Sequence, residues 1–357
     1  MKKKIVLIIS SVIIFVLLLI IILYNLGINA VGKDDTIVKF VIEEGSTYYS
    51  VIKELENDKL IKSSFWFKIY IKLNNKNRLE AGTYKLSKNM SVKEIVSVFE
   101  KGSNYNPDVI NITFKEGKNM RWIASTIASN TNNKAEDVYN LLNDKTYLNE
   151  LINEYWFIDE SIKNPNIYYS LEGYLFPNTY QFKSKEVSVK EIFKTMLDEM
   201  DKKLSNYKND LEKNKYSIHE LLTLASIVEV EGKVNSDRKG IASVFYNRLN
   251  SGWSLGSDVT TYYAIKVDMS ERDLFINEIN DNNYYNTRSN YLAGKLPVGP
   301  ICNPSIDSIE AVLYPTDNNY YYFVADKTGK TYFTNTYNEH LNKVSELKEA
   351  GLWYEYN

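Results

Sequence analysis

One segment limits this chain more than any other, an uncharged and strongly apolar run from Ile5 to Leu26. Its length of about 22 residues is enough for a helix to cross the hydrocarbon core of a bilayer. A cleavable signal peptide would have a shorter apolar core followed by a small-x-small cleavage site, and Ile28-Asn29-Ala30 is a poor one. The sequence therefore predicts an uncleaved transmembrane anchor over residues 5–26.

Charges on either side of this run predict its orientation. Residues 2–4 are all lysine, whereas in residues 33–35 one lysine is balanced by two aspartates. Because basic residues tend to stay on the cytoplasmic side, we expect a cytoplasmic tail at residues 1–4 and an extracellular location for everything after the anchor. This predicts a single-pass protein of the cell membrane, working where no supply of ATP or NAD can be assumed.

Composition excludes several classes of function. The net charge is −2, which offers no basic surface for nucleic acid, so no nucleic-acid partner is expected. The single cysteine, Cys302, cannot form an intrachain disulfide. Two histidines, His219 and His340, are too few for a histidine-rich metal site, and no phosphate-binding glycine loop is present. We therefore expect no metal and no cofactor.

A small module is predicted directly after the anchor and its linker. Residues 37–42 alternate like a strand, residues 48–57 and 65–73 have helical spacing, and residues 82–86 form a returning strand. This strand–helix–helix–strand order within residues 37–102 resembles a LysM-type glycan-binding module. A spacer domain without a ligand is the alternative.

The rest of the chain is predicted to be a mixed α+β structure. Residues 103–170 are expected to form a connecting lobe, in which residues 130–165 are polar with helical patches. Residues 171–182 are rich in aromatic side chains, and Pro177 argues for an ordered loop there. Strands are expected at 320–325 and 331–334. We assign the segment 171–357 to a catalytic domain.

The most informative stretch within this segment runs from Ser217 to Gly232. Ser217 and Glu220 form a capping-box pattern, and Gly232 can close the helix as its C′ residue. The apolar residues between these ends lie on nearly every side of the helix. We therefore expect a buried helix.

Two carboxyl side chains, Glu229 and Glu231, lie at the end of this helix, and only one of them is expected in the site. Two positions on a helix differ by about 200°, so the two side chains cannot face the same cleft. Glu229 continues an apolar row, whereas Glu231 continues the row that holds Glu220. Apolar surroundings and the negative helix end favour a protonated carboxyl, which a general acid requires. A solvated charge at the helix end is the alternative for Glu229.

Six stretches in a fixed order carry a resemblance to a known family. They are EGYLFPNTY at 172–180, LASIVEVEG at 224–232, ASVFYNRL at 242–249, YNT at 285–287, LPVGPICNP at 296–304 and YYFVADKTGKTYFTNTYNEH at 321–340. Together with the anchor and the small module, the ordered set resembles the endolytic murein transglycosylase family, also called the MltG or YceG-like family. The resemblance implies that Glu229 is the catalytic position.

The family's chemistry then follows as an expectation for this chain. The resemblance implies a membrane-anchored lyase that cuts peptidoglycan glycan strands internally, at the β-1,4 bond between N-acetylmuramic acid and N-acetylglucosamine. Its products would end in 1,6-anhydro-N-acetylmuramic acid, and the enzyme would terminate nascent strands beside peptidoglycan synthases and elongation or division proteins. One carboxyl is sufficient for this reaction, because the C6 hydroxyl of the sugar itself attacks C1.

Five further residues are predicted to contact the sugars. They are Asp258, Tyr285, Asn286, Thr287 and Asn303. For each of them, stabilisation of a loop is the alternative. The chain departs from the family pattern at Gly256 and Val259, where we expect a Gln and the Pro of an Asp-Pro pair.

Two other functions stay open at this stage. The departure at Gly256 and the LysM-like module suggest a non-catalytic, membrane-tethered peptidoglycan-binding scaffold of the cell-wall synthesis machinery. A hydrolytic muramidase with Asp258 as its second carboxylate is the third possibility, and it would produce reducing ends.

Overall fold

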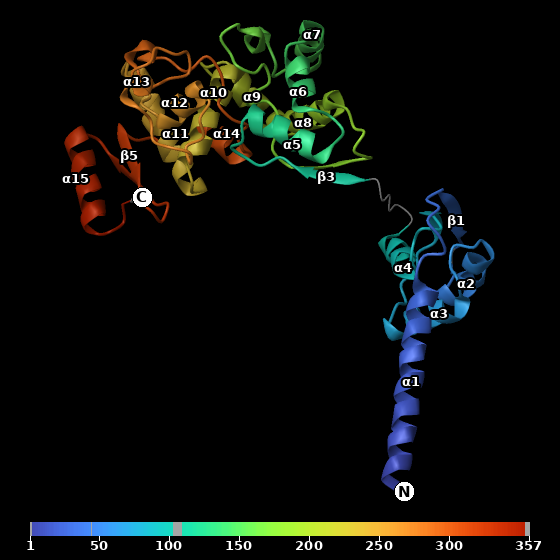
Figure 1. The fold of residues 1–357 in the computed structure, drawn as a ribbon. Coiled ribbons are helices and arrows are strands. Elements are labelled where there is room, and N and C mark those ends of the chain that lie inside the picture. The colour runs from blue at the N-terminus through green and yellow to red at the C-terminus, as the bar shows by residue number, and fades with distance from the viewer. Residues whose placement is uncertain (1, 44, 103–108, 354–357) are drawn as a thin grey trace. The chain divides into compact units, whose positions relative to one another are not determined.

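The structure is a computed structural model that describes residues 2–43, 45–102 and 109–353. The chain forms two compact units, Met1–Pro107 and Asp108–Asn357 (Figure 1). The described residues form helices and three two-stranded antiparallel sheets, which confirms the predicted mixed α+β class. The first residues of the predicted connecting lobe, 103–108, lie outside the described residues.

The first unit begins with the long helix α1 (Lys2–Ile28). Its segment Ser10–Ile28 has a mean hydropathy of 2.8 and is long and apolar enough to cross a membrane. Apolar side chains along this segment are exposed, with Phe15 at 67%. The predicted helix over residues 5–26 is therefore confirmed as a candidate membrane span, and its orientation stays a prediction.

The predicted strand–helix–helix–strand order of the small module is confirmed. The module consists of β1 (Val38–Ile42), α2 (Tyr48–Asn57), α3 (Ser64–Leu73), β2 (Gly82–Leu86) and the following α4 (Val92–Lys101). β1 and β2 pair antiparallel, with Val38 opposite Leu86. Both helices and α4 bury apolar side chains against this sheet, including Phe67 and Phe99. The relation to LysM modules stays a prediction.

In the second unit, one sheet joins the predicted lobe to the aromatic segment that follows it. β3 (Ile110–Thr113) pairs antiparallel with β4 (Thr179–Phe182). The lobe contains α5 (Met120–Asn130), α6 (Ala135–Leu142), α7 (Lys145–Glu154) and the short 3-10 helix η1 (Glu160–Lys163), and α8 (Val189–Leu204), η2 (Ser205–Tyr207) and α9 (Lys208–Glu212) follow β4. Except for η2, each of these segments contributes buried residues to one hydrophobic core, so the lobe is part of the same unit.

Helix α10 (Ile218–Glu231) lies at the centre of this core. The predicted capping box is present, since Ser217 accepts from the Glu220 amide and Glu220 accepts from the Ser217 amide. Burial on nearly all sides is also confirmed. Gly232 closes the helix as predicted, with φ −88°, which lies outside the left-handed region. A Cβ there would meet Arg238 Cγ at 2.7 Å, so close approach requires the glycine.

The remaining elements follow α10 in the chain. They are α11 (Asn235–Asn250), α12 (Asp258–Ile265), α13 (Ile276–Ile279), η3 (Asn290–Leu292), α14 (Ile306–Leu313), the hairpin β5 (Tyr322–Ala325) and β6 (Thr331–Thr334), and α15 (Tyr337–Glu349). Helices α11 and α14 pack against α10 and against each other, and α12 also contacts α10. The hairpin confirms the two predicted C-terminal strands, and α12 and α14 were not predicted.

Candidate active site

The two carboxyl groups at the end of α10 have different partners, as their spacing predicts. Glu229 is almost completely enclosed, with 5% of its side chain exposed. Its Oε1 accepts from Arg238 Nη2 at 3.0 Å, and its Oε2 accepts from the Ser305 amide at 2.9 Å and the Ser305 hydroxyl at 2.5 Å. Both oxygens of Glu229 are therefore engaged by buried donors.

Arg238 completes a closed network around Glu229. It lies in the first turns of α11 and is 6% exposed. Its Nε donates to the Gly232 carbonyl at 3.1 Å and its Nη1 to the Ser305 hydroxyl at 2.7 Å. The prediction of apolar surroundings for Glu229 is thus wrong, because the packing of α11 against α10 brings a guanidinium to the carboxyl. The network ties α10 to α11 and to the start of α14.

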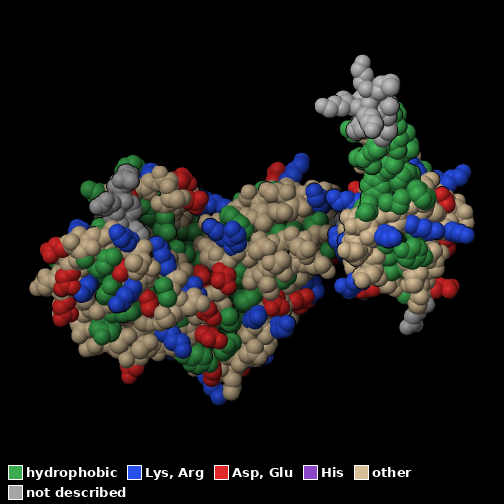
Figure 2. Space-filling model, turned by 90° about the horizontal axis from the view of Figure 1, so that it is seen from below, with side chains coloured by type: hydrophobic (Ala, Val, Ile, Leu, Met, Phe, Trp, Pro, Cys, Tyr) green, Lys and Arg blue, Asp and Glu red, His purple; other side chains and the backbone are tan. Residues whose placement is uncertain are grey.

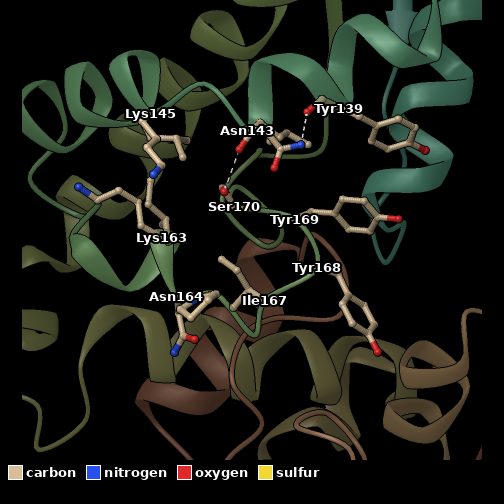
Figure 3. A pocket seen from close by; sticks show the side chains of 13 residues that line it. Tyr139, Asn143, Lys145, Lys163, Asn164, Ile167, Tyr168, Tyr169 and Ser170 are labelled. Atoms are coloured by element: carbon tan, nitrogen blue, oxygen red, sulfur yellow. Dashed lines mark hydrogen bonds between the residues drawn. The ribbon is translucent and has the colours of Figure 1, made fainter.

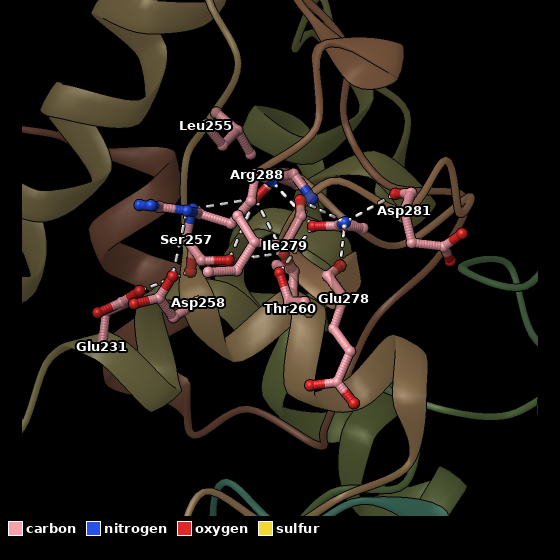
Figure 4. A network of polar contacts seen from close by, with 12 residues as sticks. Glu231, Leu255, Ser257, Asp258, Thr260, Glu278, Ile279, Asp281 and Arg288 are labelled. Carbon is pink, nitrogen blue, oxygen red and sulfur yellow. Dashed lines mark hydrogen bonds and ion pairs between the residues drawn. The ribbon is translucent and has the colours of Figure 1, made fainter. Parts of the chain in front are cut away.

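Glu231 has a more open environment. It is half-buried, and the Ser257 hydroxyl donates to its Oε1 at 2.5 Å. Burial raises the pKa of Glu231, and the nearby charge of Asp258 raises it further. The Ser257 hydrogen bond and the guanidinium groups of Arg248 and Arg288 oppose this shift. Figure 4 shows Glu231, Ser257 and Asp258 close together.

Thr287 positions the turn that carries Ser257. The Thr287 hydroxyl accepts from the Ser257 amide at 3.0 Å and lies 2.8 Å from the Thr260 hydroxyl. The Thr287 carbonyl accepts from the Gly256 amide at 2.9 Å. Gly256 itself has φ +65°, a left-handed conformation that favours glycine. A glycine in place of the expected glutamine therefore suits the backbone conformation at position 256. The next residue, Ser257, is the one that donates to Glu231.

Among the five residues predicted to contact sugar, Asp258 is the exposed one. Its side chain is 58% exposed, and it forms an ion pair with Arg288 Nε at 3.3 Å. Figure 4 places this pair beside Glu231. Asp258 can therefore reach a ligand that approaches Glu231.

The other four residues are at most 1% exposed, and their side chains hold loops. The Asn286 amide donates to the carbonyls of Glu278, Ile279 and Asp281, and the Tyr285 hydroxyl accepts from the Tyr168 amide. Asn303 accepts from the Leu175 amide at 3.0 Å. In this structure Tyr285, Asn286, Thr287 and Asn303 shape the site without reaching its surface.

A cleft of about 530 Å³ borders the end of α10. Its lining comes mainly from the start of α5 and from α12 with the residues after it, and it includes Val230, which stands between Glu229 and Glu231 in sequence. The lining residues are Gly117, Lys118, Asn119, Arg121, Trp122, Val230, Val259, Tyr262, Tyr263, Val267, Asp268, Met269, Ser270, Ile301 and Cys302. Tryptophan, tyrosine and polar side chains in one cleft suit a sugar chain, because aromatic rings stack on apolar sugar faces while polar groups bind hydroxyls.

Two acidic residues near this cleft were not predicted as site residues. Burial and the charge of Glu229 raise the pKa of Glu116, whose neighbour Gly117 lies so close that a Cβ there would be 3.5 Å from Glu229 Cγ. Glu172 is 2% exposed and accepts from the Met120 amide and the Tyr263 hydroxyl. Burial raises the pKa of Glu172 to about 8. In the sequence, each of these two glutamates is followed directly by a glycine, and this is the one local feature that could have marked them as site residues.

A second pocket of about 380 Å³ lies in the lobe. Figure 3 shows Lys145 and Lys163 on one side of it and Tyr168 and Tyr169 on the other. Tyr168 also stacks on Tyr263, which lines the cleft, with ring centroids 5.7 Å apart. The lobe pocket and the cleft are therefore joined by one aromatic contact.

The fold and the two carboxyl environments together indicate a class of protein. The second unit is an α+β domain in which the end of a central buried helix carries a half-buried carboxyl, Glu231, and borders a cleft through Val230. The chain belongs to the YceG-like family, whose match covers residues 40–346. The resemblance stated from the sequence is thereby confirmed.

Individual relatives agree with this assignment. The chain is 36% identical over 321 residues to an endolytic murein transglycosylase of Bacillus subtilis strain 168, covering 89% of this chain and 87% of that protein. It is 34% identical to the protein of that name from Streptococcus pneumoniae serotype 2, covering 87% of this chain but 58% of that longer protein. A crystal structure of a putative YceG-like protein from Listeria monocytogenes matches with a TM-score of 0.61 and 36% identity, over 87% of this chain and 99% of that one.

Proposed function

We propose that this chain is a lytic transglycosylase that cuts peptidoglycan glycan strands internally. The bond would be the β-1,4 link between N-acetylmuramic acid and N-acetylglucosamine, and the product would end in 1,6-anhydro-N-acetylmuramic acid. Support comes from the family, from relatives named endolytic murein transglycosylase, and from a carboxyl of raised pKa, Glu231, whose sequence neighbour Val230 lines the cleft. In a cell, this reaction would terminate nascent strands.

The observation that carries the mechanism is the contrast between Glu229 and Glu231. A general acid must hold a proton and reach the leaving oxygen. Glu229, the position implied by the family resemblance, has both oxygens engaged by the buried donors Arg238 and Ser305. Glu231 has a raised pKa and is partly accessible. The geometry therefore favours Glu231 as the acid and gives Glu229 a structural role.

The reaction would use Glu231 twice. The protonated carboxyl donates its proton to the glycosidic oxygen while the bond between C1 and that oxygen breaks. The resulting carboxylate then takes the proton of the C6 hydroxyl of the same muramic acid, and O6 bonds to C1. The attack is intramolecular, so no water is consumed and proximity supplies much of the rate. Ser257, held by Thr287, fixes the carboxyl between the two steps.

Asp258 and Arg288 are proposed to contact the substrate beside Glu231. Their ion pair is about half exposed, so both side chains can exchange it for hydrogen bonds to sugar hydroxyl or N-acetyl groups. Asp258 also lies close enough to raise the pKa of Glu231. Because Asp258 lies close to Glu231, a hydrolase is the second candidate function: the carboxylate of Asp258 could activate a water molecule.

The membrane placement is part of the proposal. Helix α1 would anchor the chain through residues 5–26, with the N-terminus in the cytoplasm and the small module and the second unit outside. The substrate on that side is nascent peptidoglycan, and its synthases and the elongation or division proteins are the expected partners.

The test is mass spectrometry of fragments released from uncrosslinked peptidoglycan by the full-length chain in detergent. We expect anhydro-muramic ends from the wild type. Glu231→Gln should lower their formation at least about 100-fold with an unchanged fold, because a positioned acid contributes roughly 10²–10⁴-fold. Glu229→Gln is the matched variant two residues away, and it should retain activity in whatever fraction stays folded.

Each other outcome points to a different function. Loss of activity in a folded Glu229→Gln chain with full activity in Glu231→Gln would restore Glu229 as the acid. Reducing ends, detected by borohydride reduction, would make the enzyme a hydrolase. Sedimentation with sacculi and no released fragments from any variant would favour the non-catalytic scaffold.

A further inference from the structure

Helix α3 of the small module packs against the C-terminal end of the apolar helix α1. The Trp66 ring lies 6.0 Å from the Tyr24 ring, centroid to centroid. A Cβ at Gly27 would be 2.0 Å from Trp66 Cδ1, so the glycine allows the indole to lie on the helix backbone. Lys62 Nζ donates to the Leu26 carbonyl at 3.3 Å. Figure 1 shows α3 beside this end of α1.

These contacts fix the position of α3 along the axis of α1, close to the C-terminal end of that helix. Tyr24 and Gly27 belong to the last turns of the segment Ser10–Ile28 that is apolar enough to span a membrane. Because a helix rises 1.5 Å per residue, Trp66 lies within roughly 6 Å of the end of that segment. This is the depth at which Trp and Tyr collect at the membrane–water interface.

The outer face of α3 is apolar, although the module does not cover it. Phe65 and Leu73 are 62% and 69% exposed, and Ile69 lies between them on the same stripe, half-buried. The inner face packs Phe67 and Ile71 into the core of the module. An exposed apolar stripe of this kind on a helix that already has a buried face indicates a second apolar surface.

Lysines border this stripe. Lys68 and Lys72 lie on the edge of α3 away from Trp66, since residues advance by about 100° around a helix, and Lys62 lies just before the helix. All three are exposed. Figure 2 shows Lys and Arg side chains around the foot of the green α1 column. Apolar side chains flanked by lysines are the pattern of a helix lying in the headgroup region of an anionic bilayer.

We infer that α3 is an interfacial helix that binds the outer leaflet of the membrane. Phe65, Ile69 and Leu73 would enter the acyl boundary, and the lysines would bind lipid phosphates. The stripe is continuous with the candidate span through Trp66, and its charge is complementary to anionic lipid, which together select lipid over a second protein. The inference rests on the proposed anchoring role of α1 and adds that the module itself is fixed on the membrane surface.

The test places nitroxide labels on the full-length chain, reconstituted at one chain per nanodisc. Phe65→Cys and Leu73→Cys report the stripe, Leu18→Cys reports the span, and Tyr49→Cys is the matched control, an exposed aromatic (60%) on α2. The wild type measures the background, because Cys302 is buried. In discs of phosphatidylglycerol and phosphatidylcholine, power saturation with oxygen and a nickel chelate gives the depth of each label.

We expect residues 65 and 73 to resemble residue 18, with oxygen access exceeding nickel access, and residue 49 to show the reverse. In the wild type, labels at residues 65 and 73 should lie deeper in anionic discs than in discs of phosphatidylcholine alone. Replacing Lys62, Lys68 and Lys72 by Gln should abolish this difference in depth. Persistence of that difference would overturn the role of the lysines.

Water-exposed labels at 65 and 73, with residue 18 still in lipid, would overturn the inference and leave the anchor intact. Nickel access at residue 18 would instead remove the anchor. Protection of residue 65 only at two chains per disc would mean that a second copy covers the stripe, which would also overturn lipid binding.

Discussion

The two sides of the end of α10 hold the same residue type in opposite settings. On one side, Glu229 meets a buried guanidinium and two donors from Ser305. On the other, Glu231 meets one hydroxyl, from Ser257, at the edge of exposed polar residues. Burial is deeper for Glu229, but a cation accompanies it. The comparison teaches that two carboxyl groups two residues apart can have different partners, because other parts of the chain bring a guanidinium to one and a single hydroxyl to the other.

The first prediction breaks the Glu229 side. Arg238→Met removes the buried cation and leaves the carboxylate of Glu229 unpaired, so the free energy of unfolding should fall by about 3–5 kcal/mol. Urea unfolding of the second unit, followed by tryptophan fluorescence, measures this change. Lys190→Met is the control, because its ion pair with Glu150 is exposed and should cost less than about 1 kcal/mol.

A double variant separates the ion pair from simple packing. In Arg238→Met with Glu229→Gln, no buried charge remains, and we expect recovery of part of the lost stability. The double variant could instead lose as much stability as Arg238→Met, or the sum of the losses of the two single variants. Either result would show that Arg238 acts through its packing and that the ion pair does not hold α10 to α11.

The second prediction sharpens the comparison with a third carboxyl, Glu172, which forms no ion pair within the described residues. Glu172 has a pKa of about 8, above the value near 4.5 of an unfolded chain. Between these two pH values the native state retains a proton that the unfolded state has lost, so stability falls as pH rises, by a total on the order of a few kcal/mol. Glu172→Gln keeps a neutral acceptor for Met120 and Tyr263 and should remove this loss.

Urea midpoints at pH 5, 6.5 and 8 test this expectation. The advantage of Glu172→Gln over the wild type should grow with pH, whereas Glu150→Gln, at an exposed position, should follow the wild type. If Glu172→Gln also follows the wild type, Glu172 ionises in the folded state without cost.

Much of this architecture could be predicted because its signals are local. The capping box of Ser217 and Glu220 fixes the start of α10, and alternating residues with a short turn predict the hairpin of β5 and β6. Helix α12, in contrast, could not be predicted because its local signals are weak. The sequence DVTTYYAI of α12 is β-branched and aromatic, so it has low helix propensity, and packing decides its structure.

The site was less predictable because its contacts are long-range. Arg238 reaches Glu229 only after the chain turns at Gly232, and Ser305 arrives from a loop 76 residues away. Asn286 and Thr287 have the residue types that bind sugar, but their hydrogen-bonding groups are used by the loop itself. A sequence shows which polar groups a loop has, and the tertiary fold decides which of them face solvent.

The third prediction returns to the Glu231 side. Ser257→Ala removes a hydrogen bond that favours the carboxylate, so the pKa of Glu231 should rise further. Since Glu231 must be protonated to act as acid, the alkaline limb of the pH–rate profile should move to higher pH. The rate at the optimum should fall about tenfold, because the carboxyl loses its fixed orientation. Ser254→Ala, three residues earlier, is the control.

The last prediction changes the same limb in the opposite direction. Asp258→Asn removes a negative charge that raises the pKa of Glu231, so the alkaline limb should move to lower pH. The shift should be smaller than that of Ser257→Ala and should shrink with added salt, because Asp258 is exposed and its charge is screened. An unmoved limb in both variants would mean that Glu231 does not set the profile. Opposite shifts from a hydroxyl and a carboxylate would identify it as the titrating group, since neither variant touches the network of Glu229 and Arg238.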